Sequence, residues 1–105
     1  MSEELKIELD NYVKFISALS GVLQIYLFGS YASGVSRDTS DIDLMILVEN
    51  NKDPFKTAYI IRKGLSESDY PLDIVVNRIS AFEEASESSS LQKTVKENGV
   101  LLYAS

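Results

Sequence analysis

The sequence contains no cysteine and no histidine. The lack of cysteine excludes disulfides, zinc–thiolate sites, iron–sulfur clusters and thiol nucleophiles. The lack of histidine excludes Ser–His and Cys–His catalysis and most transition-metal sites. A metal ion bound by this chain must therefore be a hard cation held by oxygen atoms, of which Mg²⁺ is the usual one. Catalytic proton transfer must come from Asp, Glu, Lys, Tyr or water.

Basic residues and long apolar runs are also scarce. Ten Lys and Arg stand against sixteen Asp and Glu, which gives a formal net charge of −6. This balance disfavours direct nucleic-acid binding and polybasic membrane contacts, since both need a basic surface. The longest aliphatic run, residues 44–48, is far shorter than the roughly 20 residues that span a bilayer. Residues 1–6 include the charged Glu3, Glu4 and Lys6 and have no apolar signal-peptide core, so we expect a cytoplasmic protein.

The remaining composition is that of one globular domain. Of the 105 residues, 45% are hydrophobic and 25% are charged, which argues against disorder. We expect a single domain over residues 1–105, because no internal repeat and no linker is visible.

Hydrophobic periodicity predicts alternating helices and strands. Apolar residues recur at steps of three and four over residues 3–19, which predicts an amphipathic helix. Runs rich in β-formers predict strands at residues 23–28, 42–48 and 72–76. The second of these is apolar on both faces after its start, as expected of a buried central strand.

Helix-start signals complete the expected elements. Asp53-Pro54 predicts the start of a helix, because Asp is a favoured N-cap and Pro a favoured first helical residue. Residues 80–83 fit a capping box, and residues 91–98 suggest a last helix before an apolar tail at residues 100–103. This alternation implies an α/β or α+β sheet with helices packed against it. The helix that starts at Asp53-Pro54 is expected to point five residues into the core: Phe55, Ala58, Tyr59, Ile61 and Leu65.

A glycine–serine pair follows the first expected strand. Gly29 and Ser30 lie where this strand ends and a short helix is expected to begin. Glycine lets the backbone approach a ligand closely, serine adds a hydroxyl, and the free N–H groups of a helix start attract an anion. The pair therefore suggests a phosphate-binding corner, although Gly-Ser after a strand is most often only a turn.

Three aspartates interrupt the apolar strands. Asp41 and Asp43 are two residues apart at the start of the second strand, so their side chains share one face. Asp73 lies in the third strand, and each of the three alone is more simply explained as a solvent-facing residue. If the third strand lies beside the second, the three carboxylates converge at one end of the sheet. Such a cluster suits Mg²⁺ together with substrate phosphates, which favours phosphoryl or nucleotidyl transfer.

The spacing of these residues resembles a known motif. Gly29-Ser30, the intervening residues 31–40 and Asp41-Ile42-Asp43 resemble the Gly-Ser-x10-Asp-x-Asp motif of the polymerase-β-like nucleotidyltransferase superfamily. The chain resembles the minimal nucleotidyltransferase (MNT) branch of this superfamily in its length, in its leading helix and in the amino-acid sequences of residues 27–32 and 97–103. Proteins of the MNT branch are often paired with HEPN-domain partners. The resemblance covers nearly the whole chain and implies a small α+β nucleotidyltransferase domain with a mixed sheet.

The resemblance also implies a role for each motif residue. Gly29 and Ser30 would hold the outer phosphates of a nucleoside triphosphate. Asp41 and Asp43 would ligate Mg²⁺, and Asp73 would complete the catalytic metal site and help to deprotonate the acceptor hydroxyl. The activity of the MNT branch is transfer of AMP from ATP to a tyrosine of the cognate HEPN toxin, which releases pyrophosphate and silences the toxin's RNase. The resemblance thus implies an antitoxin with a HEPN toxin as partner, in a homo- or hetero-oligomer.

One position departs from the family pattern, and two alternative functions stay open. Many relatives carry Arg where this chain has Ser33, and Arg37 is a candidate to compensate for it in phosphate binding. The first alternative keeps nucleotidyl transfer but uses a small-molecule hydroxyl as acceptor. The second is a non-catalytic antitoxin that neutralises its partner by binding alone.

Overall fold

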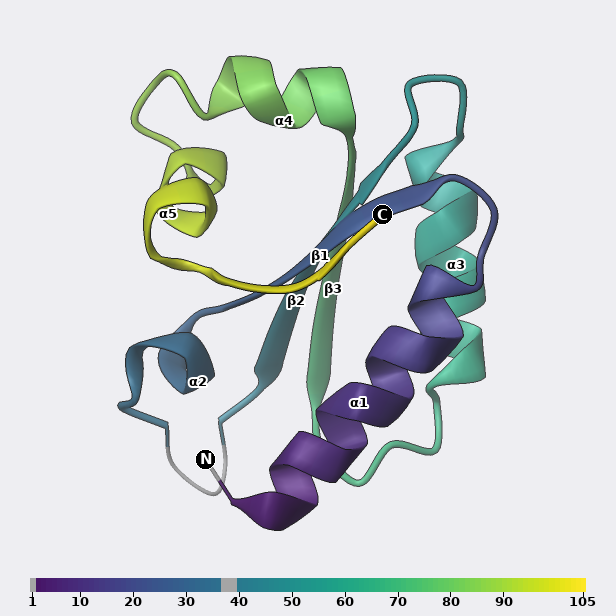
Figure 1. Ribbon diagram of the computed structural model, residues 1–105, viewed down its shortest axis with the longest axis vertical. Helices are drawn as coiled ribbons and strands as arrows, with labels where there is room; N and C mark the ends of the chain where they lie inside the picture. The colour runs from purple at the N-terminus through teal and green to yellow at the C-terminus, as the bar shows by residue number, and fades with distance from the viewer. Residues whose placement is uncertain (1, 37–39) are drawn as a thin grey trace.

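The computed structural model describes residues 2–36 and 40–105. The fold in this part of the chain is a small α+β domain with a mixed sheet and packed helices, as expected (Figure 1). None of the described helices is long and apolar enough to cross a bilayer. In chain order the elements are α1 (Glu3–Ser17), β1 (Val22–Phe28), α2 (Ser30–Ser33), β2 (Ile42–Val48), α3 (Pro54–Gly64), β3 (Leu72–Arg78), α4 (Ile79–Ala85), α5 (Leu91–Asn98) and β4 (Val100–Ala104).

The strands form one sheet in the order β3-β2-β1-β4. β2 pairs with β3 in parallel and with β1 in antiparallel fashion, and β4 adds to the other side of β1, also antiparallel. The prediction that the third strand lies beside the second is therefore confirmed. The apolar tail at residues 100–103, which carried no assignment from the sequence, belongs to β4 and forms one edge of the sheet.

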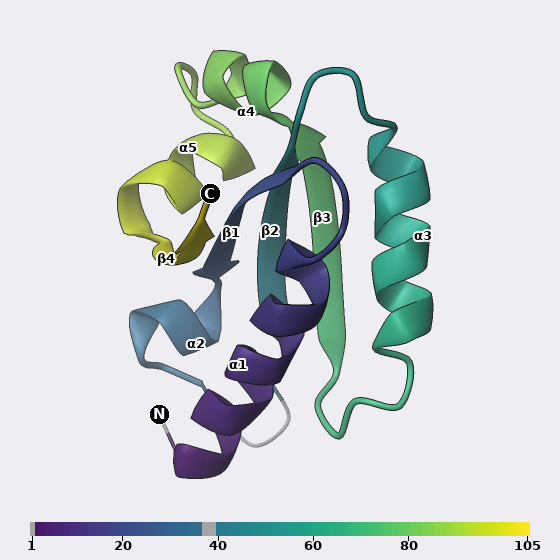
Figure 2. The same cartoon turned by 45° about the vertical axis from the view of Figure 1, so that its right-hand side comes forward.

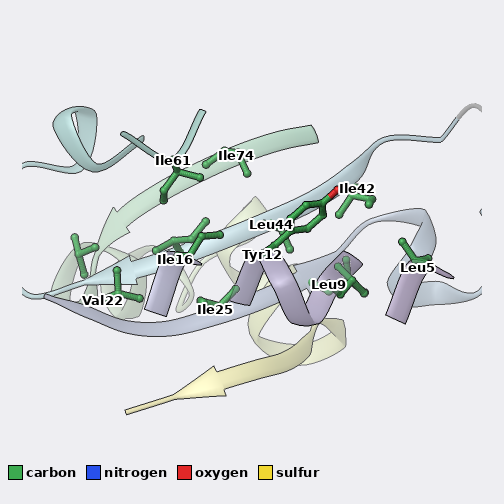
Figure 3. Close-up of a cluster of buried hydrophobic side chains, with 13 residues drawn as sticks. Leu5, Leu9, Tyr12, Ile16, Val22, Ile25, Ile42, Leu44, Ile61 and Ile74 are labelled. Atoms are coloured by element: carbon green, nitrogen blue, oxygen red, sulfur yellow. The ribbon is translucent and has the colours of Figure 1, made fainter. Parts of the chain in front are cut away.

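Helices cover both faces of the sheet (Figure 2). α1 and α3 pack on one face, where the larger core gathers around α1 and alternate residues of β2, in part labelled in Figure 3. α4 and α5 pack on the other face, over the smaller core of Met45, Leu47, Phe82 and Val95. Because successive side chains of a strand point to opposite faces, Asp43 lies on the same face of β2 as Met45 and Leu47.

A buried tyrosine ties α1 to the loop before β3. Tyr12 is only 3% exposed, and its hydroxyl is hydrogen-bonded to Ser68, whose own hydroxyl donates to the carbonyl of Tyr70 at 3.0 Å. Burial raises the pKa of Tyr12 to about 12.

The start of α3 agrees with the one predicted from the sequence, whereas the start of α4 differs from it. The Asp53 carboxylate caps α3 by accepting from the backbone N–H of Phe55 at 2.9 Å, as predicted. The expected capping box at residues 80–83 is wrong, because α4 begins at Ile79 after an N-cap residue with no side-chain cap. The N–H of Ser80 donates instead to Asn50 Oδ1 at 3.0 Å, so a residue from a distant loop supplies the acceptor.

The inward face of α3 differs from the expected one. α3 buries Thr57, Ala58 and Ile61, whereas Phe55 is 84% exposed and Tyr59 is 62% exposed. The prediction that both aromatic rings point into the core is therefore wrong. Apolar residues lie on two sides of this helix, and only contact with the sheet decides which side is buried.

Candidate active site

Gly29 turns the chain from β1 into the single turn of α2. Its backbone has φ 74° and ψ −154°, a region that is essentially restricted to glycine. The turn of α2 closes with the N–H of Ser33 donating to the carbonyl of Gly29 at 3.1 Å, and Gly34 ends it with φ 81°. The sequence prediction of a short helix directly after Gly29 is confirmed, and Ser30 is its first residue.

The Gly29 corner lies directly against Asp43. The strand pairing places Phe28 opposite Asp43, so the residue after Phe28 reaches the Asp43 side chain. A Cβ atom at Gly29 would lie 2.1 Å from Asp43 Oδ2, far inside van der Waals contact. The carboxylate therefore occupies the space that any other residue at position 29 would fill. This close contact depends on the register between β1 and β2, which the sequence does not reveal.

Asp43 and Asp73 lie side by side on neighbouring parallel strands. The register aligns the two residues as direct partners. Asp43 is half-buried and Asp73 is exposed. The pKa of Asp43 is raised, first by burial and then by the negative charges of Asp73 and Asp41. We call Asp43 and Asp73 the acid pair.

The charge of Asp41 acts on Asp43 less strongly than that of Asp73 does. It precedes β2 and is exposed, and its charge contributes to the raised pKa of Asp43. The intervening Ile42 is fully buried, and its N–H donates to the carbonyl of Pro71 at 2.8 Å, which fixes the start of β2 against β3. Within residues 2–36 and 40–105, no three acidic side chains are arranged to hold a metal ion by themselves.

The donor set of the acid pair fits Mg²⁺. Carboxylate oxygens are hard ligands, and Mg²⁺ is commonly bound by one or two carboxylates together with substrate phosphates and water. Neither of the salt bridges found among the described residues, Lys6–Glu3 and Lys93–Glu97, involves the three aspartates. In the described part of the chain, no salt bridge from a basic side chain therefore offsets the negative charge of the acid pair. A bound cation would do so.

Ser33, where the resemblance led us to expect Arg, lies in α2. Ser33 is exposed, and its hydroxyl donates to the carbonyl of Ser30 at 3.2 Å, within the same turn. Its side chain therefore stabilises α2 locally. Arg37, the candidate to compensate for Ser33, lies outside the described residues.

The fold is that of a nucleotidyltransferase domain. The Gly29 corner beside the acid pair is consistent with this class. The model of the family described as "Nucleotidyltransferase domain" matches residues 9–102. The chain belongs to this family. No curated protein matches the chain.

Several solved structures share the fold. A toxin–antitoxin complex with AMP-PNP is 25% identical with a TM-score of 0.61, and the match covers 94% of this chain and 73% of that chain. A nucleotidyltransferase of Sulfolobus solfataricus is 19% identical with a TM-score of 0.62, over 91% and 77% of the two chains. A complex of a tri-AMPylated HEPN toxin with an MNT antitoxin from Shewanella oneidensis is 22% identical with a TM-score of 0.54, over 100% and 74%. These similarities agree with the resemblance to the MNT branch.

Proposed function

We propose that this protein transfers AMP from ATP to a tyrosine hydroxyl of a HEPN-type toxin and so acts as its antitoxin. The observation that carries the proposal is the contact of the Gly29 corner with Asp43, which in turn pairs with Asp73. Membership of the nucleotidyltransferase family supports the reaction class. The similar complexes, one with AMP-PNP and one with an AMPylated HEPN toxin, support the nucleotide and the partner.

Each part of the site has a distinct task in this reaction. Gly29 and Ser30 hold the outer phosphates through backbone N–H groups and the Ser30 hydroxyl. Asp43 and Asp73, with Asp41 nearby, would hold Mg²⁺, which when bound supplies positive charge against the phosphates. Asp73 accepts the proton of the acceptor hydroxyl. The acceptor oxygen then bonds to the α-phosphorus, the bond from that phosphorus to the β-phosphate oxygen breaks, and pyrophosphate leaves.

The proposal is tested by incubating the protein with labelled ATP, Mg²⁺ and a cognate HEPN protein. We expect the mass of the HEPN protein to increase by one or more AMP units. Asp43→Asn and Asp73→Asn should abolish the transfer, whereas Asp10→Asn, an exposed acid on α1, should leave it unchanged. Absence of transfer by the unaltered protein, or equal transfer by Asp41→Ala, would contradict the proposal.

The same experiment separates the two alternatives. Transfer of AMP to a small hydroxyl compound by this chain alone would indicate a small-molecule acceptor. Neutralisation of the HEPN protein by the Asp43→Asn variant, without any AMP transfer, would indicate an antitoxin that acts by binding.

A further inference from the structure

The sheet supports the two members of the acid pair unequally. β2, which carries Asp43, lies between β1 and β3, whereas β3, which carries Asp73, has a strand neighbour on one side only. Asp43 also lies against the Gly29 corner, and Asp73 is exposed. A strand on an open edge lacks the second ladder of backbone hydrogen bonds that holds a central strand. On its open side, the position of Asp73 therefore depends on contacts other than strand pairing.

α3 supplies such a contact. Figure 2 shows α3 standing alongside β3. Ile61 of α3 and Ile74 of β3 are both buried in the larger core, and Figure 3 shows them next to each other. This packing brings the next residue of the helix, Arg62, to the backbone of the strand. One N–H group of the Arg62 guanidinium donates to the Ile74 carbonyl at 2.8 Å.

The hydrogen bond from Arg62 lies directly beside Asp73 in the chain. Ile74 follows Asp73, and because successive side chains of a strand point to opposite faces, Asp73 points away from the core that receives Ile74. Arg62 and Asp73 also line one pocket of about 380 Å³, yet neither of the salt bridges found among the described residues joins them. The link between Arg62 and Asp73 therefore runs through the backbone of β3.

Asp73 stands between two backbone anchors on opposite sides of the strand. On the inner side, the N–H of Ile42 donates to the carbonyl of Pro71 at 2.8 Å, which ties the chain just before β3 to β2. On the outer side, Arg62 holds the Ile74 carbonyl. The two anchors together fix the start of β3 from both sides at the place where Asp73 lies.

Two simpler roles of Arg62 do not require this hydrogen bond. A cation in the last turn of α3 interacts favourably with the helix dipole, and a charged side chain beside an open strand discourages pairing with another chain. Both roles need a charge but no particular carbonyl. Lys63 also supplies a charge in the last turn, and it stands over the Tyr59 ring, 5.8 Å from the ring centre.

We propose that Arg62 is a positioning residue for AMP transfer, which keeps Asp73 aligned with Asp43 by holding the Ile74 carbonyl. The inference rests on the proposed function, in which Asp73 accepts the proton of the acceptor hydroxyl. A displaced Asp73 slows this step. The Gly29 corner and Asp43 belong to the neighbouring strands, so nucleotide binding there does not depend on Arg62.

The first test measures AMP transfer to a cognate HEPN protein by the unaltered protein, Arg62→Met and Arg62→Lys. Arg62 is exposed, and methionine is a good helix former without an N–H donor, so α3 should keep its fold. We expect Arg62→Met to lower kcat by about 10–100-fold, since a misplacement of about 1 Å at the reacting groups can cost about 100-fold. The KM for ATP should change by less than about twofold. Arg62→Lys keeps a donor for the Ile74 carbonyl and should recover most of the rate.

Arg78 offers a matched control at the other end of β3. Its Nε donates to the Lys52 carbonyl at 2.9 Å, so it too ties β3 to a neighbouring segment through a hydrogen bond from an arginine to a carbonyl. Arg78 is the last residue of β3, whereas Asp73 is the second. Arg78→Met should therefore leave kcat within about twofold of the unaltered protein, because it does not move the reacting groups.

The second test follows hydrogen exchange of backbone amides by nuclear magnetic resonance, on the protein without ligands. Residues 72–76 should exchange about tenfold faster in Arg62→Met than in the unaltered protein, as expected from the loss of one hydrogen bond to a charged group. Exchange in β1 should stay the same, because β1 has strand neighbours on both sides.

Four results would overturn the inference: an unchanged kcat in Arg62→Met, no recovery in Arg62→Lys, an equal loss of kcat in Arg78→Met, or unchanged exchange over residues 72–76. Hydrogen exchange requires neither ATP nor an acceptor, so it tests the anchor independently of the reaction. Absence of AMP transfer by the unaltered protein, together with faster exchange in Arg62→Met, would contradict only the proposed function.

Discussion

Substituting Gly29 by alanine should damage the candidate active site by displacing Asp43. The new Cβ would lie 2.1 Å from Asp43 Oδ2, and the backbone at φ 74° and ψ −154° is one that residues other than glycine almost never adopt. Backbone strain of this kind costs on the order of 1–3 kcal/mol, and overpacking adds about 1–3 kcal/mol. A total loss of about 2–6 kcal/mol is large beside a typical unfolding free energy of roughly 5–15 kcal/mol.

Two comparisons separate the carboxylate contact from the backbone strain. Gly34 also has a positive φ, of 81°, but a Cβ there would meet nothing within 4 Å. Gly34→Ala should therefore cost only the left-handed backbone conformation, about 1–2 kcal/mol. In an Asp43→Ala background the carboxylate is gone, so Gly29→Ala should cost about 1–3 kcal/mol less than in the unaltered protein.

The assay is urea unfolding of the single and double variants, combined with calorimetry of ATP and Mg²⁺ binding. We expect Gly29→Ala to weaken nucleotide binding and Gly34→Ala to weaken it much less. If the cost of Gly29→Ala is the same with and without the Asp43 carboxylate, the glycine does not serve to make room for that carboxylate.

Three further predictions concern single side chains. Asp43→Asn should raise the melting temperature at neutral pH, because burial and neighbouring charges raise the Asp43 pKa in the folded state and the charged form then lowers stability. The activity of the same variant should fall by more than the roughly 10–100-fold that is typical when a residue behind a metal ligand is replaced. An unchanged melting temperature would contradict the inference that the charged Asp43 lowers stability. The free energy of unfolding should fall from pH 10 to 12 by up to about 3 kcal/mol, because the unfolded chain ionises Tyr12 at its ordinary pKa of 10.0 and the folded chain at about 12; Tyr12→Phe should remove this slope. Ser33→Arg should strengthen ATP binding by about 0.2–1 kcal/mol, the range of an exposed ion pair, and Ser33→Gln, measured alongside by calorimetry, should not.

Local signals in the sequence predicted much of the fold. The apolar run of β2 and the Asp53-Pro54 start of α3 match the structure at residue level, because each depends on neighbours in the chain. The buried side of α3 could not be predicted in the same way. Phe55 and Tyr59 form an apolar stripe as convincing as the one that is buried, and the choice between them depends on where β3 lies.

In the candidate site, too, the sequence predicts what depends on residues close together in the chain and not what depends on residues far apart. The motif spacing predicts Gly29, Ser30, Asp41 and Asp43, and the structure places the first of these in contact with the last. The position of Asp73 beside Asp43 depends on the parallel register of β2 and β3, which involves residues far apart in the chain.

The parallel pairing of β2 with β3 has a consequence during synthesis of the chain. Residues 49–71, which include α3, separate the two strands, so the partner of Asp43 is made well after Asp43 itself. A ribosome-bound chain that has emerged only as far as β2 contains Gly29, Asp41 and Asp43 but has no acid pair. The acid pair of the candidate site therefore forms late, once Asp73 has left the ribosome and β3 has paired with β2.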